Sequence, residues 1–244
     1  KQRNQIHKHN QIQRDNAEHI HGAEALLRWE HPVAGRISSP LMVKLAEEES
    51  FLDELGLYII KEACKDAQKL QKEGTPLSIS VNISPKQLES AVFVREVRRI
   101  LQEVDLHDIQ LILEVTERSL LSTSGRILER IRELKQLGIQ MSMDDFGMGH
   151  SSMMYLQENA FDEVKLDGSL VRQILENERS RDIVRGITRL AASMQFHVVA
   201  EFVETREQME LLKALHCDIY QGYYYGKPCS CDEFIIKYLK QEPR

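Results

Sequence analysis

Two adjacent acidic residues, Asp144 and Asp145, are the most informative feature of this 244-residue sequence. They lie between an apolar run that ends at Met143 and a turn favoured by Gly147 and Gly149, so they directly follow a predicted strand. Neighbouring carboxylates repel each other unless a positive group lies close by. A lysine, an arginine or a divalent metal could supply that charge, although an Asp pair alone most often belongs to a solvated loop.

The pattern recurs along the chain, because each predicted strand ends in polar residues that a buried strand would not normally contain. In a barrel of parallel strands, the carboxyl ends meet at one face, so these side chains would converge there. One polar strand end needs no special explanation, but a succession of them favours a common site. The residues are Glu24 and Arg28, Asn82, Glu114 and Glu117, Asp144 and Asp145, Lys165 and Asp167, Glu201 and Glu204, and Gln221.

The donor set favours hard divalent cations, because it offers oxygen ligands and no histidine or cysteine shares these positions. Carboxylates this close could all ionise only if about two divalent cations compensated them. Two bridged metals could activate water for in-line attack on a phosphodiester. Lys165 could orient that water or could be a structural counter-ion to the Asp pair. The candidate ligands are Glu24, Asn82, Glu114, Asp144, Asp145 and Glu201.

Strands and helices alternate along the chain, which indicates βαβ units and a parallel sheet. Gly74 and Gly138 follow two of the helices, as C-terminal capping glycines do. The predicted strands are 22–28, 77–83, 110–115, 139–143, 162–165, 197–200 and 219–221. The predicted helices are 54–73, 85–104, 124–137, 169–177, 178–194 and 205–215.

The best interpretation is a single α/β domain with a TIM-like (β/α)8 barrel, and the alternative is an open doubly wound sheet. Only seven strands are evident where a closed barrel needs eight, so the missing strand should lie within residues 1–14. Residues 4–11 are a poor candidate, which predicts a divergent or truncated first strand. Residues 1–21, rich in Gln, Asn and His, are otherwise expected to be solvated or weakly ordered, and residues 22–244 form the barrel domain.

Composition narrows the class of protein. The net charge of −6 argues against a general DNA or RNA binder. The sequence has no run of 18 apolar residues and no signal-peptide core, which predicts a chain without a membrane segment. Its four scattered cysteines suggest neither a disulfide framework nor a zinc site, and so predict a reducing, cytoplasmic setting.

Residues 24–29, Glu-Ala-Leu-Leu-Arg-Trp, resemble the signature of the EAL-domain family, phosphodiesterases that hydrolyse the bacterial messenger cyclic di-GMP. Further segments resemble the same family in the expected order, and the match spans about residues 22–228. The resemblance implies a TIM-like barrel, two Mg²⁺ or Mn²⁺ ions per site and linear pGpG as the product. The segments are Val-Asn-Ile-Ser at 81–84, Glu-Val-Thr-Glu at 114–117, Asp-Asp-Phe-Gly at 144–147, Lys-Leu-Asp at 165–167, Ala-Glu-Phe-Val-Glu at 200–204 and Gln-Gly-Tyr at 221–223.

The resemblance also implies residue roles at the matching positions. The first metal would be held by Glu24, Asn82, Glu114 and Asp144, and the second by Asp144, Asp145 and Glu201, with Asp144 bridging. The catalytic group would comprise Glu201, Lys165 holding the attacking water, Gln221, and Glu117 anchoring the loop after Asp145. The substrate would be bound by Arg28 on a phosphate, by Leu26 in the same motif, and by Asp167 and Glu204 at the rim. For Glu204, a salt bridge to a nearby Arg or Lys is an equal alternative.

Three positions depart from the family pattern. Met148 and His150 stand where the family usually has Thr and Tyr, which could loosen the loop after the Asp pair. Phe202 stands where the family usually has glycine, so its ring either crowds the second metal and shifts Glu201 or fills a gap beside the mouth.

The sequence therefore predicts a metal-dependent cyclic di-GMP phosphodiesterase. The alternative is a cyclic di-GMP receptor with weak or no turnover that signals by conformational change, but every ligand position is filled here. By resemblance, the chain is expected to form a homodimer and to be part of a larger multidomain signalling protein, which could itself be attached to a membrane.

Overall fold

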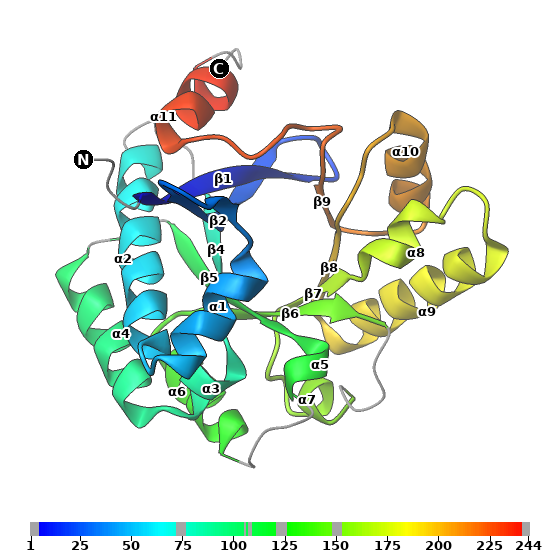
Figure 1. The fold of residues 1–244 in the computed structure, drawn as a ribbon. Helices are drawn as coiled ribbons and strands as arrows, with labels where there is room; N and C mark the ends of the chain where they lie inside the picture. Colours follow the sequence, from blue (N-terminus) through cyan, green and yellow to red (C-terminus); the bar gives the residue numbers. More distant parts are fainter. Residues whose placement is uncertain are drawn as a thin grey trace.

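Eight strands close into a barrel with helices around the outside, and Figure 1 looks along the barrel axis. This computed structural model describes residues 5–71, 77–104, 106, 109–120, 126–147 and 153–240. Closure occurs where β1 pairs with both β2 and β9, which confirms the predicted barrel over the open sheet. The strands are β1 (Gln5–Asp15), β2 (Ile20–His31), β3 (Gly35–Ile37), β4 (Ser78–Asn82), β5 (Gln110–Thr116), β6 (Gln140–Phe146), β7 (Glu163–Leu166), β8 (His197–Ala200) and β9 (Ile219–Gln221).

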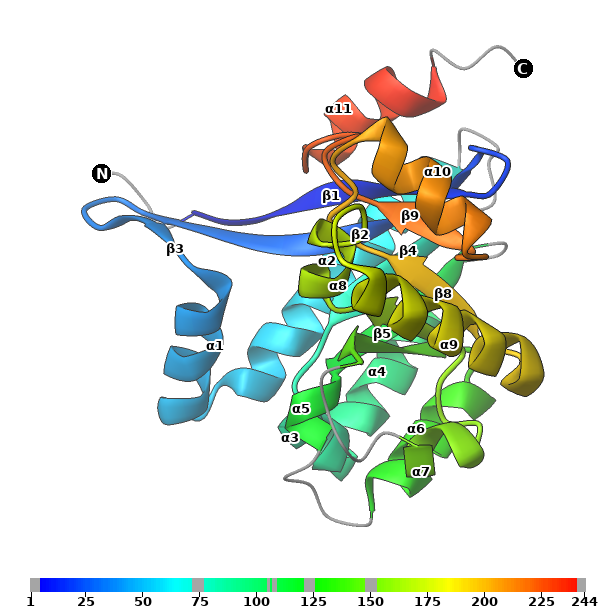
Figure 2. The same ribbon diagram turned by 90° about the vertical axis from the view of Figure 1, so that its right-hand side faces the viewer.

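The helices follow the strands for most of the chain. They are α1 (Ser39–Glu48), α2 (Leu52–Gln71), α3 (Pro85–Glu89), α4 (Ala91–Glu103), α5 (Glu117–Leu120), α6 (Ile127–Gln136), α7 (Met153–Gln157), α8 (Gly168–Arg172), α9 (Glu178–Met194), α10 (Arg206–Ala214), α11 (Cys231–Phe234) and the π-helical turn η1 (Ile235–Leu239). Figure 2 shows the hairpin of β2 and β3 extending beyond the barrel, with α1 leading back from it to α2.

The first strand was the main error of the sequence interpretation. Residues 1–21 were expected to be solvated or weakly ordered, but residues 5–15 form β1, so that expectation is wrong for this stretch. The prediction that the eighth strand lies near the N-terminus is confirmed. This strand runs antiparallel to both neighbours, whereas the other barrel pairs are parallel, because only a short turn joins it to β2.

The predicted helices are largely present, with local differences. The predicted helix over 85–104 is divided at Ser90, whose hydroxyl accepts a hydrogen bond from the Phe93 amide and so starts a new helix. The predicted helix over 169–177 is shorter, because α8 ends at Arg172. Gly138 follows α6 with φ of +84°, as a capping glycine should, and Gly74 lies outside the described residues.

Strand alternation separates two environments. Val81, Leu113 and Met143 are fully buried and belong to the apolar core, while the residue that follows each of them in its strand is polar. The register brings polar positions of adjacent strands side by side: Asn82 lies opposite Glu114, and Thr116 lies opposite Asp144. The ladder therefore gathers the polar strand ends at one mouth of the barrel.

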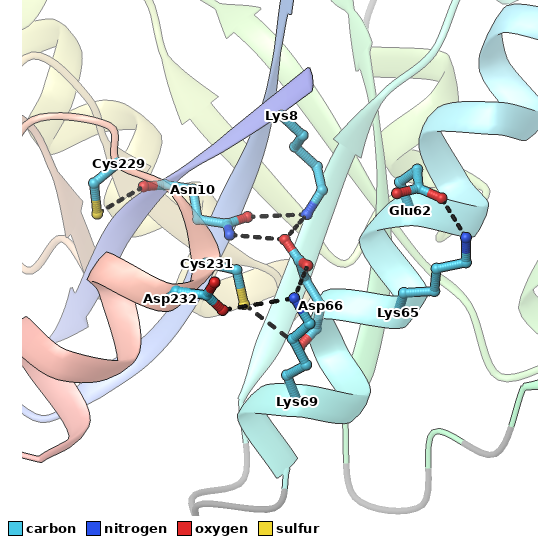
Figure 3. Close-up of polar contacts among 9 residues, drawn as sticks. All are labelled: Lys8, Asn10, Glu62, Lys65, Asp66, Lys69, Cys229, Cys231 and Asp232. Atoms are coloured by element: carbon cyan, nitrogen blue, oxygen red, sulfur yellow. Dashed lines mark hydrogen bonds and ion pairs between the residues drawn. The ribbon is translucent and has the colours of Figure 1, made fainter. Parts of the chain in front are cut away.

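A polar cluster fastens β1 to the outer helices (Figure 3). Lys8 forms an ion pair with Asp66 of α2, and the Asn10 amide donates to the same carboxylate at 3.1 Å. The Asn10 backbone pairs with Cys229 in both directions, at 2.7 and 3.1 Å. Lys69 lies 3.6 Å from Asp232 in α11 and joins the cluster. Since β1 closes the barrel, this cluster stabilises the closure.

Replacing Asp66 should destabilise the fold. The Lys8 side chain is 7% exposed, so D66A deprives a largely buried ammonium and the Asn10 amide of the carboxylate that they share. We expect the free energy of unfolding to fall by about 3 kcal/mol in urea titrations. The matched double variant K8M/D66L should recover most of that loss, because it removes both charges. A loss below about 1 kcal/mol in D66A would contradict this role.

Candidate active site

The centre of the barrel mouth is the buried ammonium of Lys165, which lies at the end of β7. Its Nζ is 2.7 Å from Glu201 Oε1, 2.8 Å from Glu114 Oε2 and 3.3 Å from Glu24 Oε2. The Lys165 side chain is 1% exposed, and that of Glu114 is fully buried. Four strands thus contribute to one charged cluster: β2, β5 and β7 by these side chains, and the end of β8 through Glu201.

Amide side chains fix the Glu24 carboxylate in place. Asn82 donates to Glu24 Oε1 at 2.7 Å, and Gln221 donates to Oε2 at 2.5 Å. Gln13 of β1 in turn donates to the Gln221 side-chain oxygen at 2.8 Å. This chain of hydrogen bonds links β1, β9, β2 and β4 around the mouth, and it leaves Glu24 little freedom to rotate.

The Asp pair ends β6 in an unusual backbone conformation. Asp145 has φ of +56°, and its amide donates to the Asp144 side chain at 2.8 Å. The next turn is held by Glu117, because the Gly147 amide donates to its carboxylate at 3.2 Å. Glu117 therefore contacts the loop after Asp145, where the sequence interpretation placed it; its part in catalysis remains a prediction.

Burial and the surrounding charges shift the pKa values in the cluster in different directions. Burial opposes the charged forms of Lys165 and Glu24. Its effect is outweighed by the surrounding carboxylates, which raise the pKa of Lys165. For Glu24, Lys165 and the hydrogen bonds from Gln221 and Asn82 outweigh burial and lower the pKa. Burial, reinforced by Glu24, raises the pKa of Glu114 well above its usual value and that of Glu201 to about 8. Burial and then Asp144 raise the pKa of Asp145.

The donor chemistry at this mouth fits a hard divalent cation. Its acidic and amide side chains offer oxygen ligands, and the buried Glu114 Oε1 has no hydrogen-bond partner among the residues that the structure describes. Within the described ranges, no three His, Cys, Asp or Glu side chains form a ready-made metal-binding group. The reason is that Lys165 lies between the carboxylates as their counter-ion. The ligand roles of the six candidates therefore remain predictions.

A cavity of about 380 Å³ opens beside this cluster. It brings together most of the predicted substrate and metal residues, while Glu114 and Lys165 are buried against the carboxylates of its wall. Asp167 is absent from the lining, because its carboxylate accepts the Ser169 amide at 2.8 Å and caps α8. Among the predicted residues, those lining the cavity are Glu24, Leu26, Arg28, Asp144, Glu201, Glu204 and Gln221.

Comparison with known proteins identifies the family. The chain matches the EAL domain over residues 3–228. The chain belongs to the EAL domain family. It is 34% identical over 223 residues to the cyclic di-GMP phosphodiesterase NbdA of Pseudomonas aeruginosa, covering 90% of this chain and 28% of NbdA. It is 40% identical over 215 residues to an uncharacterized signaling protein of Caulobacter vibrioides, covering 88% of this chain and 26% of that protein. The chain thus spans about a quarter of the length of these two relatives.

A solved EAL structure has the same fold. The PaMucR phosphodiesterase in complex with c-di-GMP superposes with a TM-score of 0.85 at 32% identity, covering 94% of each chain. This likeness over nearly the whole chain supports the TIM-like barrel. In the part of the chain that the structure describes, no helix has the length and apolar character needed to cross a membrane.

Of the three positions that depart from the EAL pattern, the structure describes Phe202. Met148 and His150 lie outside the described residues. Phe202 adopts φ of +55°, a conformation that glycine reaches freely. Its ring packs against Gly168 and beneath Arg172, while Glu201 keeps its 2.7 Å contact with Lys165. These contacts match the alternative in which the ring fills a gap beside the mouth. Whether the ring also affects a bound metal stays a question for experiment.

The sequence interpretation missed polar residues of β1. Gln11 lines the cavity and lies opposite Glu24 in the register, and Gln13 anchors Gln221. No sequence pattern marked this strand, because Ile6 and Ile12 are the only apolar residues in Gln5–Asp15 and a buried strand is expected to show a regular apolar pattern. Tyr223 lines the same cavity and is 58% exposed.

Stability in EDTA should fall as pH rises from about 5 to about 8. The pKa of Glu201 is raised from an unfolded value near 4.5 to about 8, so the folded chain holds a proton across this window that the unfolded chain has lost. Glu114 shifts in the same direction. We expect thermal unfolding temperatures to decrease over this range and the decrease to diminish when Mn²⁺ is added.

A matched variant isolates this effect. Burial and then His197 lower the pKa of His21, which makes an opposite contribution. The variant E201Q keeps a neutral side chain at all pH values, so its stability should depend less on pH than that of the wild type. Equal slopes in the two proteins would contradict the assignment to Glu201.

Proposed function

We propose that this chain is a phosphodiesterase that hydrolyses cyclic di-GMP to linear pGpG with two divalent ions, Mg²⁺ or Mn²⁺. The observation that carries the proposal is the convergence of Glu24, Glu114 and Glu201 on Lys165 at the barrel mouth. Asp144 lines the adjoining cavity, so oxygen donors and a cation lie beside a space for substrate. The relatives named as cyclic di-GMP phosphodiesterases support the substrate.

The metal ions would be held by Glu24, Asn82, Glu114, Asp144, Asp145 and Glu201. When bound, such ions neutralise phosphoryl charge and favour ionisation of the attacking water. The residues of the chain would position the reactants. Lys165, fixed by three carboxylates, would place positive charge where it can orient water or stabilise charge on the phosphoryl oxygens. Gln221 and Asn82 hold Glu24 in one orientation.

Substrate contacts would come from the cavity wall. Arg28 lines the cavity and is partly buried, and its guanidinium can donate two parallel hydrogen bonds to two oxygens of one phosphate group. Leu26 and Glu204 line the same cavity. Asp167 would act indirectly, by capping α8 rather than by touching substrate.

Further properties belong to the proposal by analogy with the family. We expect the chain to act as a homodimer in the cytoplasm, as one domain of a larger signalling protein. The relatives it matches are much longer than the matched region, which supports a multidomain context. The alternative function is a cyclic di-GMP receptor without turnover, and the filled set of carboxylates argues for the enzyme.

Hydrolysis of cyclic di-GMP by the purified chain tests the proposal. With Mn²⁺ or Mg²⁺, separation of the products should show pGpG, and EDTA should abolish the reaction. The variants E24A and D145N should each reduce kcat at least about a hundredfold, because each removes a proposed ligand. A matched control is E129A, since Glu129 is an exposed carboxylate on α6 that does not line the cavity.

Two outcomes would refute parts of this proposal. Tight binding of cyclic di-GMP without turnover, in protein loaded with either metal, would favour the receptor. Wild-type rates in E24A and D145N would show that the site lies elsewhere in the molecule.

A further inference from the structure

Phe202 occupies a backbone conformation that a bulky side chain normally avoids. Its φ of +55° lies in the left-handed region, which glycine enters without strain but which disfavours residues with a β-carbon. It directly follows Glu201, at the point where the chain leaves β8 for the barrel mouth. A side chain retained at such a position needs a local role.

The Phe202 ring has three well-defined surroundings. One part rests on Gly168, where an added β-carbon would come within 2.5 Å of the ring. One face lies under Arg172, whose guanidinium carbon is 4.1 Å from the ring centroid. The remainder is open, since the residue is 42% exposed and lines the cavity beside the carboxylates. Gly168 thus gives the ring room, and Arg172, four residues further along α8, covers it.

The position of the ring suits a nucleoside. Phe202 directly follows Glu201, and consecutive Cα atoms are about 3.8 Å apart. The aromatic ring and the Glu201 carboxylate therefore leave the backbone at neighbouring positions. A nucleotide whose phosphate lies at the carboxylates would extend its base along the same cavity. Flat aromatic faces and guanidinium planes both stack on bases, and an arginine fork can also reach O6 and N7 of guanine.

We infer that Phe202 and Arg172 together form a stacking surface for one guanine base of the substrate. The inference rests on the proposed function for the ligand and adds two residues that set affinity for it. Tyr223 is the competing aromatic platform, because it lines the same cavity and Lys227 lies 5.5 Å from its ring centroid.

Affinity for cyclic di-GMP tests the inference. F202G should raise the Kd, measured by calorimetry in EDTA, at least about tenfold, because stacking on an aromatic ring is removed. Glycine accepts the φ of this position, so the variant should remain folded, which urea titration checks. F202Y keeps the ring and should bind like the wild type. R172M keeps the stem over the ring without the charge and should weaken binding several-fold.

Kinetics separate stacking from a structural effect. With Mn²⁺, F202G should raise KM for cyclic di-GMP by a similar factor and change kcat much less. A methyl group at position 168 should displace the Phe202 ring. G168A should therefore weaken binding in the wild type but not in the F202G variant, which has no ring.

A fluorescent reporter gives a direct signature of contact. Trp29 is the single tryptophan of the chain, so W29F/F202W carries one indole at position 202. Stacking of guanine should quench its emission when cyclic di-GMP is added in EDTA. The W29F variant, without an indole, supplies the background signal.

The outcomes distinguish this inference from the proposed function. The stacking surface alone would be overturned, and the proposed function kept, if F202G and G168A left the Kd unchanged. The same holds if cyclic di-GMP did not quench an indole at position 202. Weakened binding in Y223A but not in F202G would assign the base to Tyr223 and overturn it as well. Binding by the wild type without turnover would refute the enzymatic function. The Kd values of F202G and G168A would still decide whether the stacking surface exists. No binding by the wild type, with or without Mn²⁺, would overturn both.

Discussion

The structure depends on one buried ammonium. Lys165 is 1% exposed, and an unpaired charge at that depth would cost several kcal/mol. It is tolerated because Glu24, Glu114 and Glu201 surround it, and these acids in turn could not be buried without it. Each of these residues lies in a different strand or directly after one, so the charge balance requires the strands to be in register. The barrel and its mouth are therefore stabilised together.

The sequence predicted the parts of the fold that obey ordinary patterns. Seven strands were evident because their apolar residues pack against helices, and their polar ends revealed which face they share. The first strand was hidden, since Gln11 and Gln13 place amides where a buried strand normally places apolar side chains. Its outer face is also polar, with Lys8 and Asn10 satisfied by Asp66 of α2. Those partners lie more than fifty residues away, and no local pattern could have predicted them.

In the site, too, the features that depend on residue type and strand position could be predicted, and those that depend on packing between distant segments could not. Residue type and strand position were sufficient to assemble Glu24, Glu114, Lys165 and Glu201, because parallel strands align their carboxyl ends. The role of Asp167 could not be inferred in this way, since its place at the start of α8 turns its carboxylate toward the Ser169 amide. The contact between Phe202 and Arg172 depends on how α8 packs beside β8, which no spacing in the sequence specifies.

Backbone strain marks the two strand ends where the chemistry is proposed. Asp145 and Phe202 both have positive φ, and each lies beside a carboxylate of the cluster. Such conformations cost about 1–3 kcal/mol and persist when surrounding contacts fix them. For Asp145, the hydrogen bonds of Asp144 and Glu117 on either side fix the turn. For Phe202, the ring contacts with Gly168 and Arg172 serve the same purpose.

The ratio of charges at the mouth explains why a lysine and metal ions would be needed together. Five carboxyl groups, of Glu24, Glu114, Asp144, Asp145 and Glu201, share one ammonium, so a single cation leaves an excess of acids. Burial, together with that excess, raises the pKa values of Glu114, Asp145 and Glu201. Glu24 is the exception, because Asn82, Gln221 and Lys165 stabilise its charge. The cluster therefore combines the fixed and ionised Glu24 with Glu114, Asp145 and Glu201, whose ionisation further positive charge would favour, so cation binding there would be accompanied by proton release.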